Sequence, residues 1–144
     1  MKNLIVCLLL CSPFVLTAGE GDNPKDAIRK VLDAQVQAWN KGDLLGFMEG
    51  YWKSPDLSFF SGNNKAAGWQ ATLERYQKKY QGEKKEMGQL AFKDLSIDLL
   101  GTDHALVKGR FQLQMKQEAP TGIFTLILKK VPAGWRIIHD HTSG

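Results

Sequence analysis

The spacing of the apolar residues changes near Gly88, and this change constrains the fold more than any other feature of the sequence. Before Gly88, apolar residues recur every three or four positions, which is typical of helices with one buried face. After Gly88, apolar and polar residues alternate, which is typical of strands. Helices followed by strands with short turns predict an α+β domain, with the helices packed on one face of a curved antiparallel sheet.

Three helices are predicted in the first part of the chain. The first begins at Pro24, with Asn23 as its N-cap, and ends before Gly42, which suits a left-handed C-terminal position. Asp43 is expected to cap a short second helix. The third covers about residues 69–80, where leucine and aromatic side chains share one face.

The strands come mainly after the helices. A short strand at residues 57–61 precedes the third helix, and residues 62–68 are predicted to be a loop. The four long strands are predicted at residues 89–100, 104–117, 122–131 and 135–142. The third of these is apolar on both faces between residues 123 and 128, so both faces of the sheet need a cover. The helices supply one cover, and a second copy of the chain is the simplest source of the other.

The amino terminus has the three parts of a secretory signal. Lys2 precedes an uncharged run, residues 4–18, that ends in small side chains. This run is shorter than the ~20 apolar residues that span a bilayer, so we predict no stable membrane span. We predict a signal peptide at residues 1–18, a leader at 19–25, a domain at 26–144, and export to the periplasm or the extracellular space.

Removal of the signal changes what the composition implies. The whole chain has 144 residues, two cysteines and a net charge of +4, whereas the remaining 126 residues contain no cysteine and carry +3. The exported chain therefore forms no disulfide. Its lysine pairs are isolated, unlike the clustered basic stripe of a nucleic-acid surface. We predict no nucleic-acid partner and no cofactor.

Several segments resemble the SnoaL-like branch of the nuclear transport factor 2-like superfamily. Residues 135–144 (WRIIHDHTSG) are similar to the W-x-I-V-H-x-H-x-S ending of that family, and to the ending of the calcium/calmodulin-dependent protein kinase II association domain. Residues 39–43, 68–76 and 101–111 are similar to its first helix end, third helix and first hairpin. The resemblance implies a cone-shaped, cystatin-like roll with three helices on a bent sheet, a pocket in the cone, and dimerisation through the outer sheet face. It leaves the function open, because the superfamily includes enzymes, ligand binders and assembly domains.

Two histidines lie close together near the end of the chain. His139 and His141 share one face of the predicted last strand with Trp135 and Ile137, and the resemblance implies that this face lines the cone. General acid or base catalysis, metal binding and hydrogen bonding within the pocket wall are all open to them. The H-x-H spacing lacks a third ligand, since His104 lies at a hairpin, so we predict no metal site.

Asp140 is predicted to point to the opposite face from the histidines unless a bulge intervenes. Ketosteroid isomerase-type chemistry on this fold needs a carboxylate base in an apolar cavity, facing an acid. Asp94 and Asp98 are the other candidates, but no pair of carboxylates supports that chemistry.

Arg110 is a candidate for binding a ligand carboxylate. Strand alternation places it on the face of Lys108 and Gln112, which favours solvent or a subunit interface over the pocket.

The aromatic residues are the strongest sign of a cavity. Tyr51 and Trp52 are expected near its mouth, where such side chains supply an apolar body and a polar tip. Ordinary core packing is the alternative explanation, and it is favoured for Trp39. The predicted ligand-binding residues are Trp39, Tyr51, Trp52, Phe59, Trp69, Tyr76, Arg110, His139 and His141.

Three functions are open. The preferred hypothesis is an exported, homodimeric domain that binds a small apolar or weakly acidic molecule in an aromatic-lined cone. His139 and His141 would supply its polar contacts, with Tyr51 or Tyr76 as partners. The second is a cofactor-independent enzyme of the polyketide cyclase or ketosteroid isomerase kind, with a pocket histidine as acid or base. The third is an assembly domain that acts through its sheet.

Overall fold

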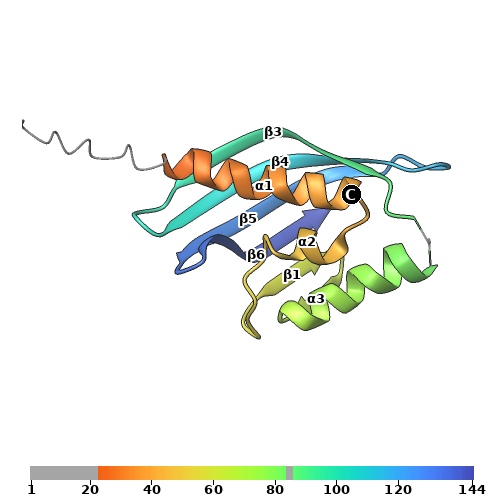
Figure 1. Cartoon of the computed structure of the whole chain (residues 1–144), viewed down its shortest axis with the longest axis horizontal. Helices are drawn as coiled ribbons and strands as arrows, with labels where there is room; N and C mark the ends of the chain where they lie inside the picture. Colours follow the sequence, from red (N-terminus) through yellow and green to blue (C-terminus); the bar gives the residue numbers. More distant parts are fainter. Residues whose placement is uncertain (1–22, 84–85) are drawn as a thin grey trace, which may run out of the picture.

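The computed structural model describes residues 23–83 and 86–144 (Figure 1). The predicted signal peptide lies outside these residues. The helices are α1 (Pro24–Asn40), α2 (Leu44–Met48) and α3 (Trp69–Tyr76), and α3 continues into a π-helical segment, Gln77–Glu83. The strands are β1 (Ser58–Ser61), β2 (Asn64–Ala67), β3 (Gln89–Leu99), β4 (His104–Gln114), β5 (Thr121–Val131) and β6 (Gly134–Ser143). Within the described residues, no helix is long and apolar enough to cross a membrane.

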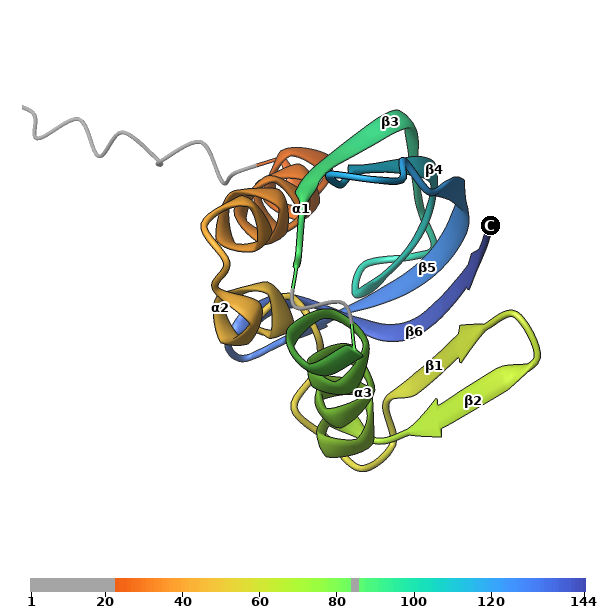
Figure 2. The same ribbon diagram turned by 90° about the vertical axis from the view of Figure 1, so that its right-hand side faces the viewer.

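The six strands form one curved sheet in the order β2-β1-β6-β5-β4-β3. Figure 2 shows the three helices on its concave side, which confirms the predicted α+β arrangement. Every neighbouring pair is antiparallel except β1 and β6, which are parallel. The sheet is therefore mixed rather than antiparallel throughout. No hairpin joins β1 to β6, because α3 and four strands separate them along the chain, so a turn does not set their relative direction.

The predicted helix ends are confirmed. The Asn23 side chain accepts a hydrogen bond from the backbone N–H of Lys25 at 3.0 Å, and Gly42 follows α1 with a φ of 76°. The Asp43 carboxylate accepts from the backbone N–H of Gly46 at 2.8 Å, at the start of α2. These two ends turn the chain sharply, so that α2 follows α1 onto the concave side of the sheet.

The segment predicted as a loop at residues 62–68 contains a strand. β2 pairs with β1 in a hairpin, with Phe59 opposite Ala66. The sequence NKAA carries no β-branched or large apolar side chain, so the propensity signal for a strand is absent there. The strand forms because its backbone hydrogen-bonds to β1. This hairpin forms one edge of the sheet (Figure 2).

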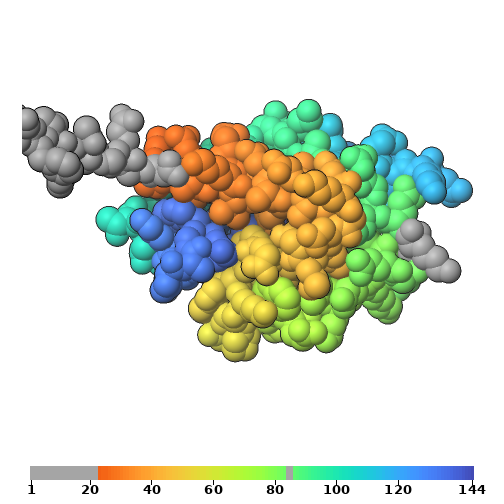
Figure 3. All heavy atoms as spheres, viewed as in Figure 1, coloured from red at the N-terminus to blue at the C-terminus, as the bar shows by residue number. Residues whose placement is uncertain are grey.

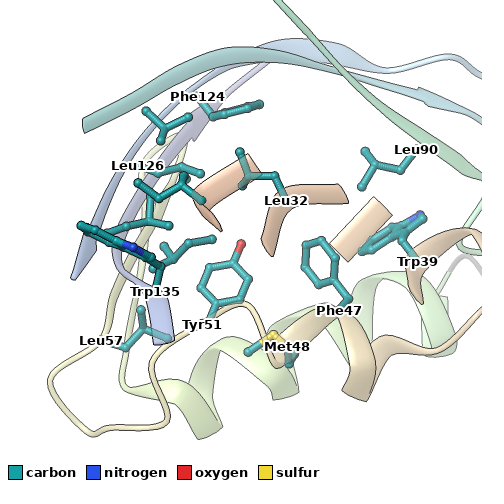
Figure 4. Packing of buried hydrophobic residues seen from close by; sticks show 14 of the residues in the cluster. Leu32, Trp39, Phe47, Met48, Tyr51, Leu57, Leu90, Phe124, Leu126 and Trp135 are labelled. Atoms are coloured by element: carbon teal, nitrogen blue, oxygen red, sulfur yellow. The ribbon is translucent and has the colours of Figure 1, made fainter. Parts of the chain in front are cut away.

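The hydrophobic core lies between the helices and the concave sheet face. On α1 the buried stripe is Ile28, Leu32, Gln35 and Trp39. Figure 4 shows Leu32 and Trp39 of this helix facing Leu126 and Leu90 of the sheet, with Phe47 and Met48 of α2 beside them. In the space-filling view, the atoms of α1 and α2 meet those of α3 and form much of this side of the molecule (Figure 3).

A β-bulge interrupts β6 at Ile138. Ile127 of β5 pairs with His139, but the next residue, Leu128, pairs with Ile137, so Ile138 is an extra residue without a partner. An extra residue reverses the alternation of side chains beyond it. As a result Ile137 and Asp140, which are three positions apart, both point to the concave side and are both buried.

Candidate functional site

A cavity of about 120 Å³ lies between the helices and the concave face of the sheet. One water molecule needs roughly 10–15 Å³ of such space, so the cavity is large enough for a small organic molecule. Its walls are mainly aromatic and come from every part of the chain that packs on the concave side. The aromatic lining residues are Trp39, Phe47, Tyr51, Phe59, Tyr76, Tyr80, Phe92, Phe111 and Phe124.

One carboxylate lies inside this apolar cavity. Asp140 is 3% exposed and sits between Leu126 on β5 and Phe59 on β1, its partners in the two neighbouring strands. The Tyr51 hydroxyl donates to Asp140 Oδ2 at 2.7 Å, and the Thr142 hydroxyl donates to Oδ1 at 2.6 Å. Figure 4 shows the Tyr51 hydroxyl directed away from Met48 and into the interior. The buried carboxylate is therefore hydrogen-bonded on both oxygens.

The hydroxyl groups of this network form a chain that ends at Asp140. Tyr51 has one hydroxyl proton, which it gives to the carboxylate, so it is the acceptor in its 3.5 Å contact with the Tyr76 hydroxyl. Tyr76 is then the donor to Tyr51. The network consequently offers lone pairs, and no further hydroxyl proton of Tyr51, Tyr76 or Thr142, to a molecule in the cavity.

Burial shifts the acidities of these groups. Desolvation raises the pKa of Asp140 from 3.8 to about 6, although the hydrogen bonds from Thr142 and Tyr51 and the charge of His141 act in the opposite direction. Desolvation and the neighbouring Asp140 charge also raise the pKa of Tyr51 and of Tyr76 well above the ordinary value for tyrosine. Near neutral pH the site is therefore a carboxylate with two protonated phenols.

The open rim of the cavity is polar and carries positive charge. Along β6 exposure increases from Asp140, which is buried, through Thr142 to Gly144, which is exposed. Arg75 and Lys79 also border the cavity, from the end of α3 and the π-helical segment that follows it. The Arg75 guanidinium lies 5.9 Å from the centre of the Phe59 ring.

Four of the predicted ligand-binding residues do line the cavity: Trp39, Tyr51, Phe59 and Tyr76. Trp39 is also held by a hydrogen bond from its indole N–H to the Met87 carbonyl at 2.8 Å. Its ring contacts those of Phe47 and Tyr76, so the cavity wall and the core share this residue.

Three other predicted residues lie outside the cavity. Trp69 at the start of α3 donates its indole N–H to the Met48 carbonyl of α2 at 3.1 Å. Trp52 is half-buried and does not line the cavity. Arg110 is exposed on β4, with its Nε 3.9 Å from the carboxylate of Asp94. The face predicted for Arg110 from strand alternation is confirmed, and the neighbouring Phe111 points into the cavity.

The prediction that His139 and His141 line the cone is wrong. The bulge at Ile138 reverses the alternation of β6, so both imidazoles lie on the outer face, beside Ser58 and Phe60 of β1. His139 Nδ1 is 2.6 Å from the Ser58 hydroxyl, and the Phe60 ring makes edge contacts with both histidines. Partial burial, and then the charge of His141, lowers the pKa of His139.

Sequence reasoning missed Asp140 and Arg75 as cavity residues. Asp140 lies three residues after the buried Ile137, so regular alternation would point its carboxylate outward. Only a bulge between the two residues turns it inward. Arg75 precedes Tyr76 on α3 and gave no separate signal. The described residues contain no group of three or more histidine, cysteine or acidic side chains that could hold a metal ion.

Solved structures with the same fold include three with informative similarity. An NTF-2-like protein of unknown function from Shewanella oneidensis MR-1 is 38% identical, with a TM-score of 0.80 over 85% of this chain and 100% of that one. An NTF2-like superfamily protein from Salmonella enterica serovar Typhimurium LT2 is 22% identical, with a TM-score of 0.68 over 84% and 90% of the two chains. A Xanthomonas campestris protein assigned to the calcium/calmodulin-dependent protein kinase II association domains is 18% identical, with a TM-score of 0.65 over 81% and 84%.

The family assignment rests on most of the chain. No curated protein sequence matches it. Residues 28–144 match the SnoaL-like domain, and this range includes every residue that lines the cavity. The chain therefore belongs to the SnoaL-like domain family and has the NTF2-like, cystatin-like fold.

Proposed function

We propose that this protein binds a small, mainly apolar molecule in the aromatic-lined cavity. The observation that carries the proposal is one buried carboxylate, Asp140, in a cavity lined largely by aromatic and aliphatic side chains. Ligand sites are mostly apolar with a few polar groups that fix orientation, and Asp140 with Tyr51 and Tyr76 has that composition. We therefore expect these three residues, rather than His139 and His141, to make the polar contacts with the ligand.

Binding is tested by thermal unfolding with a panel of small aromatic and alicyclic compounds, and by mass spectrometry of molecules that co-purify with the protein. We expect at least one compound to raise the melting temperature, because a ligand that binds only the folded state stabilises it. Leu126→Phe adds volume to the cavity wall and should abolish the rise. Leu45→Phe, on an exposed position of α2, is the matched control and should leave it intact. A panel without any stabilising compound would contradict the proposal.

The same network argues against an isomerase reaction. Such a reaction needs an acid near the base to stabilise the enolate. The Tyr51 hydroxyl proton is given to Asp140, and the Tyr76 hydroxyl contacts that of Tyr51, so the phenols serve the carboxylate network rather than an enolate. An enzyme with a pocket histidine is contradicted by the position of both imidazoles on the outer face.

We also propose that the chain forms a homodimer through the outer face of the sheet. Ile123 on β5 is 55% exposed there, and Ile127, four residues further along the same face, is half-buried. Association of two such faces would cover both side chains. Sedimentation should give a dimer for the wild type, a monomer for Ile123→Lys, and a dimer for the control Leu45→Lys. A wild-type monomer at micromolar concentration would contradict this assembly.

Export is proposed from the signal-like residues 1–18. Expression of the full chain, followed by fractionation and N-terminal sequencing, tests it. We expect an exported product that begins at Gly19 or Glu20. A product that keeps Met1 inside the cell would contradict export.

A further inference from the structure

Two opposite charges border the cavity but do not pair with each other. Arg75 forms no ion pair with any residue in the described part of the chain, and the Asp140 carboxylate receives hydrogen bonds from hydroxyl groups alone. Both residues are neighbours of Phe59. Phe59 is the strand neighbour of Asp140 on β1, and the Arg75 guanidinium lies over its ring. A guanidinium and a carboxylate therefore border the same cavity without forming an ion pair with each other.

The buried end of the cavity accepts hydrogen bonds. The Tyr51 and Thr142 hydroxyls both donate to Asp140, and Tyr76 donates to Tyr51. A ligand group at this end meets lone pairs of Asp140 and Tyr76, so it must bring its own proton. A second anion is disfavoured here, because it would face a desolvated carboxylate.

The rim of the cavity donates hydrogen bonds. A guanidinium carries five N–H donors and no acceptor, and its planar shape matches a carboxylate. The Lys79 side chain borders the same rim. The Arg75 guanidinium also lies 5.9 Å from the centre of the Phe59 ring, which is part of the cavity wall. The rim therefore favours an anionic group.

We propose that the ligand is a small ring compound with a hydroxyl group at one end and a carboxylate at the other. The hydroxyl donates to Asp140 or Tyr76 at the buried end, the ring packs among the aromatic walls, and the carboxylate binds Arg75 at the rim. This assignment rests on the proposed binding function and adds the chemical class and the orientation of the ligand.

The test compares four compounds by isothermal titration calorimetry at about pH 7.5. The parent is para-hydroxyphenylacetate. Its methoxy analogue lacks the hydroxyl proton, its methyl ester lacks the anion, and methyl para-methoxyphenylacetate lacks both. We expect the parent to bind at least about tenfold more tightly than either singly altered compound, since a hydrogen bond to a charged group is lost in each case.

Variants assign each end of the ligand to a residue. Arg75→Gln should weaken binding of the parent about tenfold but leave binding of the methyl ester within about twofold. Asp140→Asn should reduce the ratio of the affinities for the hydroxyl and the methoxy compound. The ratio of the affinities for the acid and the methyl ester should stay as in the wild type. Arg110→Gln, on the exposed outer face, is the matched control and should change neither preference.

The outcomes separate this inference from the binding function itself. If all four compounds bind equally well, the cavity binds ligands and the proposed polarity is overturned. If Arg75→Gln weakens the ester as much as the acid, the carboxylate position is overturned. If none of the four compounds binds, while the neutral panel raises the melting temperature, the ligand class is overturned and the binding function stands. If neither set binds, both proposals fail.

Discussion

Replacing Asp140 by asparagine should remove a pH dependence of stability that the structure assigns to this one carboxyl group. Burial raises its pKa from 3.8 to about 6. Between these values the folded state binds a proton that the unfolded state has released, so the free energy of unfolding falls as pH rises. One pKa unit corresponds to ~1.4 kcal/mol, so the fall between pH 3.8 and 6 amounts to about 3 kcal/mol.

The measurement is urea unfolding of the wild type and of Asp140→Asn at several values between about pH 4 and pH 7. The quantity of interest is the difference in unfolding free energy between the two proteins, because contributions from other carboxylates cancel in it. We expect the wild type to lose about 3 kcal/mol relative to the variant across this range. A carbon-13 NMR titration of the Asp140 carboxyl group reads the same pKa directly.

Tyr51→Phe supplies a second, independent change. The Tyr51 hydroxyl donates to Asp140, and this hydrogen bond lowers the carboxyl pKa. Its removal should raise the pKa further, so the loss of stability with pH becomes larger in this variant. A wild-type difference that stays level, or that grows with pH, would refute the reasoning. It would mean that the pKa of Asp140 in the folded state is not raised above its value in the unfolded state.

Three further changes test the fold and the site. Leu32→Ala in the core should cost roughly 2–5 kcal/mol of unfolding free energy by urea denaturation, whereas Leu45→Ala, 57% exposed on α2, should change it by less than ~0.5 kcal/mol; similar effects at both sites would contradict the burial. Asp43→Ala should cost about 1 kcal/mol in the same assay. Asp43→Asn should stay close to the wild type, because the side-chain oxygen of either aspartate or asparagine can accept the hydrogen bond that caps α2. Alanine at both His139 and His141 should leave ligand affinity within about twofold by calorimetry, since neither imidazole lines the cavity; a tenfold loss would place at least one of them in contact with the ligand.

Much of the fold followed from periodicity and from a few end signals. Asn23, Gly42 and Asp43 set the ends of α1 and α2 through local hydrogen bonds and backbone angles, which depend on neighbouring residues alone. The long strands were predicted because one of their faces is buried along most of their length. β2 was not predicted, since its pairing to β1 comes from tertiary structure rather than from its own residues.

The candidate site was predictable only in part. Aromatic residues such as Tyr51 and Phe59 were identified because they lie on elements that the resemblance places around one cone. The polar end of the cavity was missed, because face assignment on a strand assumes unbroken alternation. The register of β5 against β6 decides that question, and it depends on contacts between strands that the order of residues does not show.

The bulge at Ile138 determines the charge of the cavity in this chain. After Ile138, which side chains of β6 point inward depends on whether this extra residue is present. Deletion of Ile138 would turn His139 and His141 inward and expel Asp140, so a single codon separates an acidic interior from a basic one on the same backbone. In this chain the register of β6 therefore decides the charge inside the cavity, and the H-x-H motif alone does not predict it.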